Sequence, residues 1–176
     1  MVVNPAVRPK VATTGLVIAS AVVFIVFAFS FGALAATELP LVMKVIVGSL
    51  LLATVLVLAL LWGKRSAQRR TWLANAANRW RSFDSAKLAS GTTTEVTLLS
   101  VDALQPTGAW VTIMWNRFNH VQRAWIEALP EPLWPGSVLL IAPDPTQVMP
   151  SAPWPETYFI RAADCLAWAP AEGRSP

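Results

Sequence analysis

Two long uncharged runs near the N-terminus constrain the fold of this chain more than any other feature. Residues 11–37 and residues 45–63 contain no Asp, Glu, Lys or Arg. A transmembrane helix needs about 20 apolar residues to cross a hydrocarbon core about 30 Å thick. We therefore expect two transmembrane helices, at residues 11–36 and 40–63, preceded by an N-terminal tail at residues 1–10.

A cleaved signal peptide is the alternative explanation for the first run. The apolar region of a signal peptide normally has about 7–15 residues. This run is longer, and a second apolar run follows it after a few residues. We therefore expect both helices to remain in the chain as an antiparallel hairpin, which is the arrangement that a short connection imposes on neighbouring helices.

Basic residues beside the two helices predict their orientation. The N-terminal tail carries Arg8 and Lys10, the start of the second helix carries only Lys44, and four cations follow that helix at residues 64–70. Lys and Arg beside membrane helices are retained on the cytoplasmic side. We therefore predict a two-pass protein of the cell membrane with both termini in the cytoplasm and residues 37–40 on the opposite side.

The two apolar helices offer packing surfaces but no chemistry. Neither carries an ionisable residue at its centre, although ion sites and proton relays usually need one. Ala28, Gly32 and Ala36 follow one another at a spacing of four, and small residues at this spacing let helix backbones approach closely. We expect this ridge to pack on the second helix or on another membrane protein; chance in an alanine-rich helix is the alternative.

Residues 64–90 are typical of a basic amphipathic helix. Apolar residues recur there at spacings of three and four, and Lys64 to Lys87 contain seven cations and one acid. Tryptophan beside arginine after a membrane helix suits the lipid headgroup layer. We predict that this helix lies on the inner leaflet and binds anionic lipid; the alternative is that its apolar face packs on the following domain. The residues expected at the headgroups are Lys64, Arg65, Arg69, Arg70, Trp72, Arg79, Trp80 and Arg81.

After Gly91 the apolar pattern changes to an alternation of period two. This alternation predicts a small all-β domain at residues 91–170, followed by a flexible tail at residues 171–176. Five or six short strands without a convincing helix indicate an OB-like barrel or a curled sheet. The expected strands are residues 94–101, 109–116, 121–128, 137–142 and 157–163, with residues 165–169 extending the fifth or forming a sixth.

The chain contains nine tryptophans, more than a small β domain needs for its core. Trp110 and Trp115 lie five residues apart in one predicted strand, so one should be in the core and the other on the surface. Trp154 ends a loop at residues 143–155 that contains five prolines. This stiff loop suits docking on a protein partner; the alternative, which is the commoner outcome for such a loop, is that it folds back on its own domain. The predicted docking residues are Trp110, Trp115 and Trp154.

No motif for catalysis or for cofactor binding is found in the sequence. The single histidine, His120, and the single cysteine, Cys165, are too few for a zinc site, and Cys165 lies in an apolar stretch that favours a buried, inert thiol. Residues 88–176 carry four cations and eight acids, a balance that does not favour nucleic acid. We therefore expect no enzyme activity, no metal, no cofactor and no small-molecule substrate.

The order of membrane helices and a small β domain resembles the bacterial NfeD-like proteins, which carry an OB-like barrel after membrane helices. The resemblance is one of layout and brings no site residue with it. We expect a non-catalytic accessory or assembly subunit of a larger bacterial membrane complex, of respiratory or cell-envelope type, with the bilayer and other membrane subunits as partners. The alternatives are a membrane-surface regulator that binds anionic lipid through residues 64–87, an NfeD-like interaction module, and an enzyme of a type that the sequence does not reveal.

Overall fold

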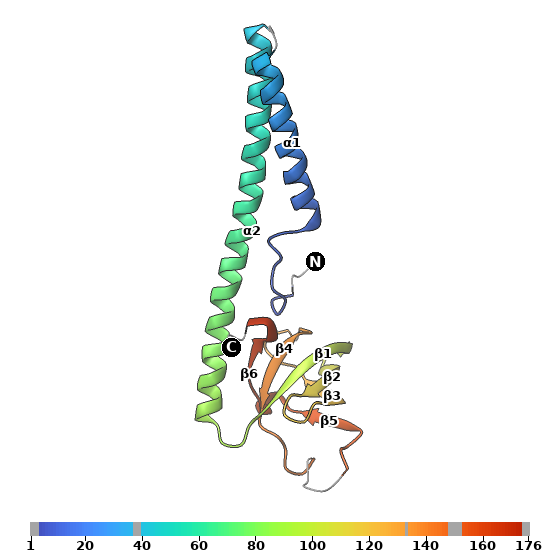
Figure 1. Ribbon diagram of the computed structural model, residues 1–176. Coiled ribbons are helices and arrows are strands. Elements are labelled where there is room, and N and C mark those ends of the chain that lie inside the picture. The colour runs from blue at the N-terminus through green and yellow to red at the C-terminus, as the bar shows by residue number, and fades with distance from the viewer. Residues whose placement is uncertain (1–3, 37–39, 133, 148–152, 174–176) are drawn as a thin grey trace. The chain divides into compact units, whose positions relative to one another are not determined.

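The computed structural model describes residues 4–36, 40–132, 134–147 and 153–173 (Figure 1). The predicted tight connection between the two helices and the middle of the proline-rich loop lie largely outside the described residues. The chain divides into two compact units. Pro9–Thr71 form the first, which we call the helix-pair unit; Met1–Arg8 together with Trp72–Pro176 form the second, which we call the sheet unit.

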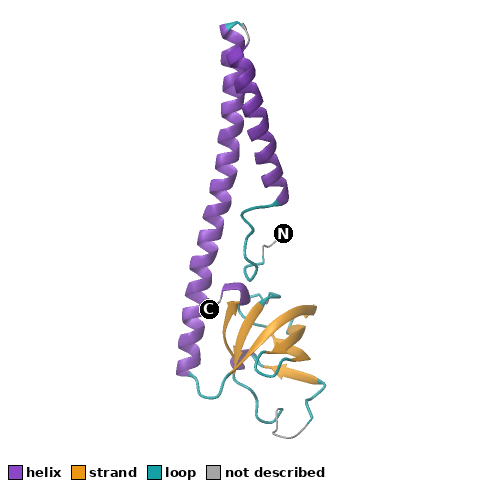
Figure 2. Cartoon of the chain, viewed as in Figure 1, coloured by secondary structure: helices purple, strands orange, loops and turns teal. Residues whose placement is uncertain are grey.

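The helix-pair unit contains α1 (Thr14–Ala36) and the first part of α2 (Leu41–Ala89) (Figure 2). Both helices are long and apolar enough to cross a membrane, and most of their described large apolar side chains in this unit are exposed. The predicted second membrane helix and the predicted amphipathic helix are one element, because α2 continues without a break through Gly63 to Ala89. The residues that follow Gly63 are mostly good helix formers and include no proline, so nothing ends the helix there.

The sheet unit contains six strands at the predicted places. Residues 165–170 form a strand of their own rather than an extension of the fifth, and β1 is longer than predicted because its hairpin with β2 closes at Gln105–Gly108. The strands are β1 (Thr94–Gln105), β2 (Gly108–Trp115), β3 (His120–Glu127), β4 (Ser137–Ile141), β5 (Thr157–Ile160) and β6 (Cys165–Pro170).

The six strands form one mixed sheet in the order β5-β3-β2-β1-β4-β6. Every neighbouring pair is antiparallel except β3 and β5, which run parallel. Since β5 and β6 stand at the two edges of this order, the sheet is open. Of the two predicted forms, the pairing corresponds to a sheet rather than to a closed barrel.

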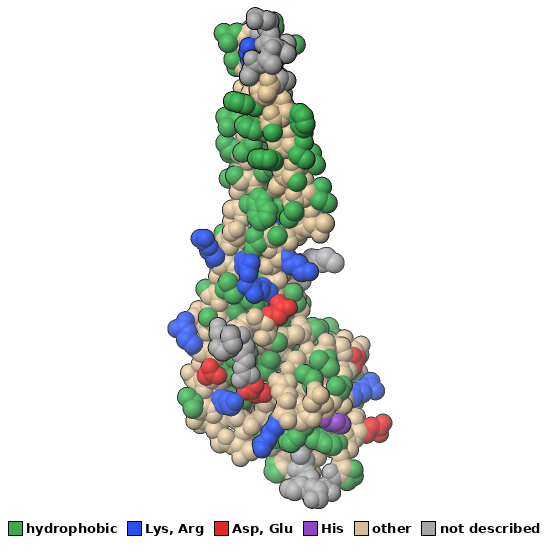
Figure 3. Space-filling model, viewed as in Figure 1, with side chains coloured by type: hydrophobic (Ala, Val, Ile, Leu, Met, Phe, Trp, Pro, Cys, Tyr) green, Lys and Arg blue, Asp and Glu red, His purple; other side chains and the backbone are tan. Residues whose placement is uncertain are grey.

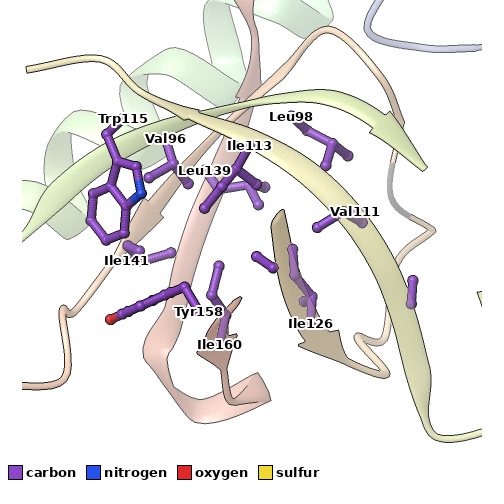
Figure 4. Packing of buried hydrophobic residues seen from close by; sticks show 12 residues of the cluster. Val96, Leu98, Val111, Ile113, Trp115, Ile126, Leu139, Ile141, Tyr158 and Ile160 are labelled. Carbon is purple, nitrogen blue, oxygen red and sulfur yellow. The ribbon is translucent and has the colours of Figure 1, made fainter. Parts of the chain in front are cut away.

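One face of the sheet, which we call the inner face, carries the main hydrophobic core (Figure 4). Its members occupy alternate positions on β1 to β5, and Trp115 and Tyr158 are the largest of them. Their rings meet edge to face with centroids 5.0 Å apart. The Trp115 indole N–H donates to Gln122 Oε1 over 2.8 Å, so the buried donor of Trp115 and the buried acceptor of Gln122 satisfy each other.

The opposite face, which we call the outer face, is covered at β4 by the C-terminal part of α2. Trp80 and Phe83 pack there against Val138 and Leu140, and the Trp80 indole N–H donates to the carbonyl of Pro170 over 3.0 Å. All five residues of β4 are buried, because this strand is apolar on both faces and needs a partner on each. The apolar face of the basic helix is therefore occupied by the sheet, which is the alternative to the predicted position on a lipid leaflet.

The N-terminal tail belongs to the sheet unit as well. Asn4 donates from its side-chain amide to the carbonyl of Pro135 over 3.1 Å, and the Arg8 backbone N–H donates to Glu172 Oε2 over 2.9 Å. Between these contacts, Ala6 is 1% exposed. Both ends of the described chain are thus parts of one compact unit.

Candidate functional site

Three aromatic side chains form a row on the outer face of β2, β3 and β5. The register places Trp110 opposite Trp125, and Trp125 beside Phe159. Phe159 is 51% exposed, and both tryptophans are partly exposed, whereas the residues on either side of each are mostly buried. We call Trp110, Trp125 and Phe159 the aromatic row.

The rings of the aromatic row are held in place by their neighbours. Trp110 and Trp125 meet edge to face with centroids 5.1 Å apart, a favoured geometry for aromatic pairs. The guanidinium carbon of Arg123 lies 4.8 Å from the centroid of the Trp110 ring. A Cβ at Gly108 would approach the Trp125 ring to 2.7 Å, so the glycine leaves the space that this ring occupies. The row is therefore preorganised before any partner arrives.

A shallow depression of about 470 Å³ lies along the aromatic row, with Glu127 and Arg161 among its lining residues. Arg161 donates from Nε to Asp164 Oδ2 over 2.7 Å, and this carboxylate raises the pKa of the guanidinium. Glu127 accepts a hydrogen bond from the backbone N–H of Ala162 over 2.8 Å. An apolar aromatic centre with charges of both signs at its rim is the usual anatomy of a protein interface.

The free edge of β5 is closed by a side chain at Phe159. Gln147 accepts from the Phe159 backbone N–H over 2.8 Å and donates to the Phe159 carbonyl over 3.0 Å. Asp144 accepts hydrogen bonds from Thr146 and from Gln147, and these bonds lower the pKa of its carboxyl group. Since the edge is occupied here, a partner is expected to use the outer face of β5 rather than add a strand to its edge.

Comparison with known proteins gives no relative from which a role could be transferred. No protein-family model, no curated protein and no solved structure matches the chain. The resemblance of its layout to NfeD-like proteins therefore stays a prediction, and function has to be argued from the chemistry of the surface itself.

The three predicted docking tryptophans have different surroundings. Trp110 lies in the aromatic row, but Trp115 is 2% exposed in the core and is not accessible to a partner. This division confirms that two residues five apart in the strand point to opposite faces. Trp154 is half-buried, and its ring stacks on His120 at 4.6 Å and lies 5.2 Å from Trp115 between centroids. The end of the proline-rich loop thus folds back on its own domain. Only the exposed part of the Trp154 ring could still contact a protein partner, and that contact stays a prediction.

The predicted headgroup residues also divide into two groups. Lys64, Arg65, Arg69 and Arg70 lie in the helix-pair unit, and Figure 3 shows Lys and Arg side chains gathered where the apolar stretch of the helices ends. Arg81 is exposed and donates to Asn78 Oδ1.

The sheet unit instead contains Trp72, Arg79 and Trp80, and each of them contacts other residues of that unit. Trp80 is buried, and the Trp72 indole N–H donates to the carbonyl of Pro5 over 2.8 Å. The Arg79 guanidinium carbon lies 3.8 Å from the centroid of the Trp168 ring, and its NH2 lies 3.0 Å from Glu131 Oε2. Trp80 is therefore not accessible to lipid, whereas headgroup binding by the partly exposed Trp72 and Arg79 stays a prediction. Tryptophan beside arginine suits a sheet with cation–π partners as well as it suits a headgroup layer.

The described part of the small-residue ridge, Ala28 and Gly32, does not join the two helices. Ala28 and Gly32 are exposed, and a Cβ added at Gly32 would meet nothing within 4 Å. The side chain of Ala36 lies outside the described residues. Packing of Ala28 and Gly32 on the second helix is therefore not seen, and packing on another membrane protein stays a prediction.

Sequence reasoning missed Trp125 and Phe159, although a signal for Trp125 was present. The short gap between the second and third predicted strands indicates a hairpin. In the structure this hairpin pairs Trp115 with His120, and counting back along both strands places Trp110 opposite Trp125. No comparable signal exists for Phe159, because the parallel pairing of β3 with β5 joins segments separated by β4 and the proline-rich loop.

The single histidine and the single cysteine of the chain lie on strands far apart in the sheet order. His120 begins β3 and Cys165 begins β6, with β2, β1 and β4 between them. Burial raises the pKa of the Cys165 thiol to about 11, the opposite of what an activated nucleophile needs. Among the residues that the structure describes, no three His, Cys, Asp or Glu side chains lie close enough together to hold a metal ion.

We expect Cys165 to react slowly with iodoacetamide at pH 8 in the folded protein. Raising the pKa from 9.0 to about 11 lowers the thiolate fraction roughly 100-fold, and the greater nucleophilicity of a more basic thiolate recovers about tenfold. Alkylation, followed by mass spectrometry, should therefore be at least about tenfold slower than in urea-unfolded protein. The folded protein keeps the Cys165 thiol protonated between pH 9.0 and about 11, whereas the unfolded chain loses that proton in this range. The free energy of unfolding should therefore fall as the pH rises toward 11. Equal rates in folded and unfolded protein would contradict a half-buried thiol with a raised pKa.

Proposed function

We propose that this chain is a non-catalytic accessory subunit of a larger membrane protein complex, anchored by α1 and α2 and docked to its partner through the aromatic row. The proposal rests on the aromatic row, because its rings are held in place by their neighbours and are still partly exposed to solvent. Tryptophan anchors of this kind dominate the binding energy of protein interfaces. The charged rim of Glu127 and Arg161 would set the orientation of the partner.

Anchorage is supported by the surface of the helix-pair unit. Large apolar side chains are exposed along both helices, and an exposed apolar surface of this extent is not stable in water. The contacts of Asn4 and Arg8 within the sheet unit support a topology in which both termini share one side. The cations at Lys64, Arg65, Arg69 and Arg70 favour the cytoplasm as that side.

We expect reporter fusions to place both termini in the cytoplasm. Green fluorescent protein fused after Pro176 should fluoresce, and alkaline phosphatase fused there should be inactive, because that enzyme needs the oxidising exterior for its disulfides. Alkaline phosphatase inserted between residues 37 and 40 should be active. Phosphatase activity of the Pro176 fusion would contradict the proposed topology.

The oligomeric state of the full chain tests whether a partner exists. After extraction in a mild detergent, native gel electrophoresis with mass spectrometry should find the 19.1 kDa chain together with at least one other membrane protein in constant stoichiometry. A chain that runs alone under every mild extraction condition would contradict the accessory role.

A further inference from the structure

We propose that the helix-pair unit binds one anionic phospholipid from the inner leaflet, with an acyl chain in a groove between α1 and α2 and the headgroup at the cations beside Arg65. This inference rests on the membrane anchorage proposed above. It concerns the helix-pair unit alone and is independent of the aromatic row.

Two hydrogen bonds join the helices at one end of the pair. The Trp62 indole N–H donates to Ser20 Oγ over 3.1 Å, and Arg65 NH1 donates to Thr13 Oγ1 over 2.6 Å. The second bond fixes the guanidinium of Arg65 between the two helices. These bonds hold the polar end of the pair together without requiring the helices to pack closely farther along.

From Ser20 onward the helices leave an apolar groove of about 870 Å³ between them. Apart from Ser20, every lining residue is apolar. Phenylalanines dominate its α1 side, and Gly48 opens its α2 side, because a Cβ built there would meet nothing within 4 Å. The lining residues include Phe24, Phe27, Phe31, Leu52 and Val55. Such a groove in a membrane has to be filled by a hydrocarbon chain or by the side chains of another helix.

The charge at the polar end favours a lipid over a helix. The helix-pair unit carries Lys10, Lys64, Arg65, Arg69 and Arg70 at that end, and its only acid is Glu38, in the connection at the other end. No ion pair involves any of these five cations in the part of the chain that the structure describes. A phospholipid with an anionic headgroup satisfies the groove and the cations with one molecule, whereas an apolar helix would leave the cations without a counter-charge.

Native mass spectrometry of the detergent-solubilised full chain tests this proposal with two lipids of identical acyl chains. Palmitoyl-oleoyl phosphatidylglycerol should form a one-to-one adduct at a markedly lower concentration than palmitoyl-oleoyl phosphatidylcholine. Arg65→Gln should reduce this preference about fivefold, since one cation near a lipid surface contributes about that factor. Equal binding of the two lipids by the wild-type chain would overturn the proposal whatever the variants do.

Two glycine substitutions test the groove itself. Gly48→Leu fills it and should weaken adducts of both lipids about tenfold, because it displaces the equivalent of about two methylene groups of an acyl chain. Gly15→Leu is the matched control, since Gly15 also has open space at its Cβ but does not line the groove, and its adducts should match those of the wild type. Wild-type lipid binding by Gly48→Leu would overturn the proposal. Loss of a co-purifying membrane protein instead of lipid would also overturn it, and would assign the groove to a partner helix.

Carbonate extraction of membranes separates failure of this inference from failure of the proposed function. A chain that stays in the membrane pellet but shows no preference for phosphatidylglycerol keeps its anchorage and lacks only the lipid site. A chain that is released by carbonate lacks the anchorage on which both proposals depend.

Discussion

Trp115→Ala lowers the free energy of unfolding of the sheet unit by about 3–5 kcal/mol, which is the usual range for truncating a buried tryptophan. Trp115 is 2% exposed and packs against both Tyr158 and Trp154. Its removal leaves a cavity and also takes the donor away from Gln122 Oε1. Urea unfolding of the full-length protein in detergent, followed by near-ultraviolet circular dichroism, measures the change.

Trp110→Ala is the matched control for this prediction. Trp110 lies in the same strand and loses the same number of atoms, but its ring is partly exposed on the outer face. We expect it to cost the edge-to-face contact with Trp125, about 0.5–1.5 kcal/mol, and part of its apolar burial. Equal destabilisation by the two substitutions would show that the outer face is as important to the fold as the inner core.

The strands of the sheet unit could be predicted because each carries its own signal. Alternation of apolar residues marked β1 to β3, and the turns at Gln105–Gly108 and after Trp115 marked where they end. Asn119 adopts a positive φ of 50° in the second of these turns, a conformation that asparagine tolerates better than most residues. Local chemistry therefore determined these elements, and the prediction needed no knowledge of the rest of the fold.

The cover of β4 by α2 was only the alternative in the sequence analysis, because its two halves lie far apart in sequence. Val138 and Leu140 needed a partner, and Trp80 and Phe83 were available as one, but the same helical stripe also fits a lipid surface. Period and composition are alike for a helix on a sheet and a helix on a bilayer. Only the three-dimensional pairing decides between them, and the same holds for the docking of Ala6 and the rest of the N-terminal tail.

The candidate site was half predictable for a similar reason. The parity of the strand placed one of Trp110 and Trp115 on a surface without deciding which, and the hairpin register could have placed Trp125 beside Trp110. Phe159 depended on a parallel pairing across β4 and the proline-rich loop. Trp154 was one of the predicted docking residues, but its ring is half-buried, since proline restricts the backbone of a loop without determining which way its aromatic residue points. In the structure this ring lies against His120 and Phe118.

Trp125→Ala should release the chain from its complex while leaving the sheet unit folded. Trp125 is the central member of the aromatic row, with Trp110 on one side and Phe159 on the other. Truncating an interface anchor of this kind costs about 2 kcal/mol or more of binding, which weakens the complex roughly 30-fold. Co-purification of the full-length variant, set beside its urea unfolding, separates a binding defect from a folding defect.

Leu88→Ala and Trp125→Phe complete the test of the aromatic row. Leu88 is 88% exposed on α2 and lies outside the row, so its truncation should leave both stability and co-purification unchanged. Trp125→Phe keeps an aromatic ring over Gly108 and should retain more of the partner than Trp125→Ala does. A Trp125→Ala variant that stays folded and keeps every partner would exclude the row as the docking surface. The exposed part of Trp154 would then be the remaining predicted anchor on the sheet unit, because Trp110 belongs to the same row and Trp115 is enclosed in the core.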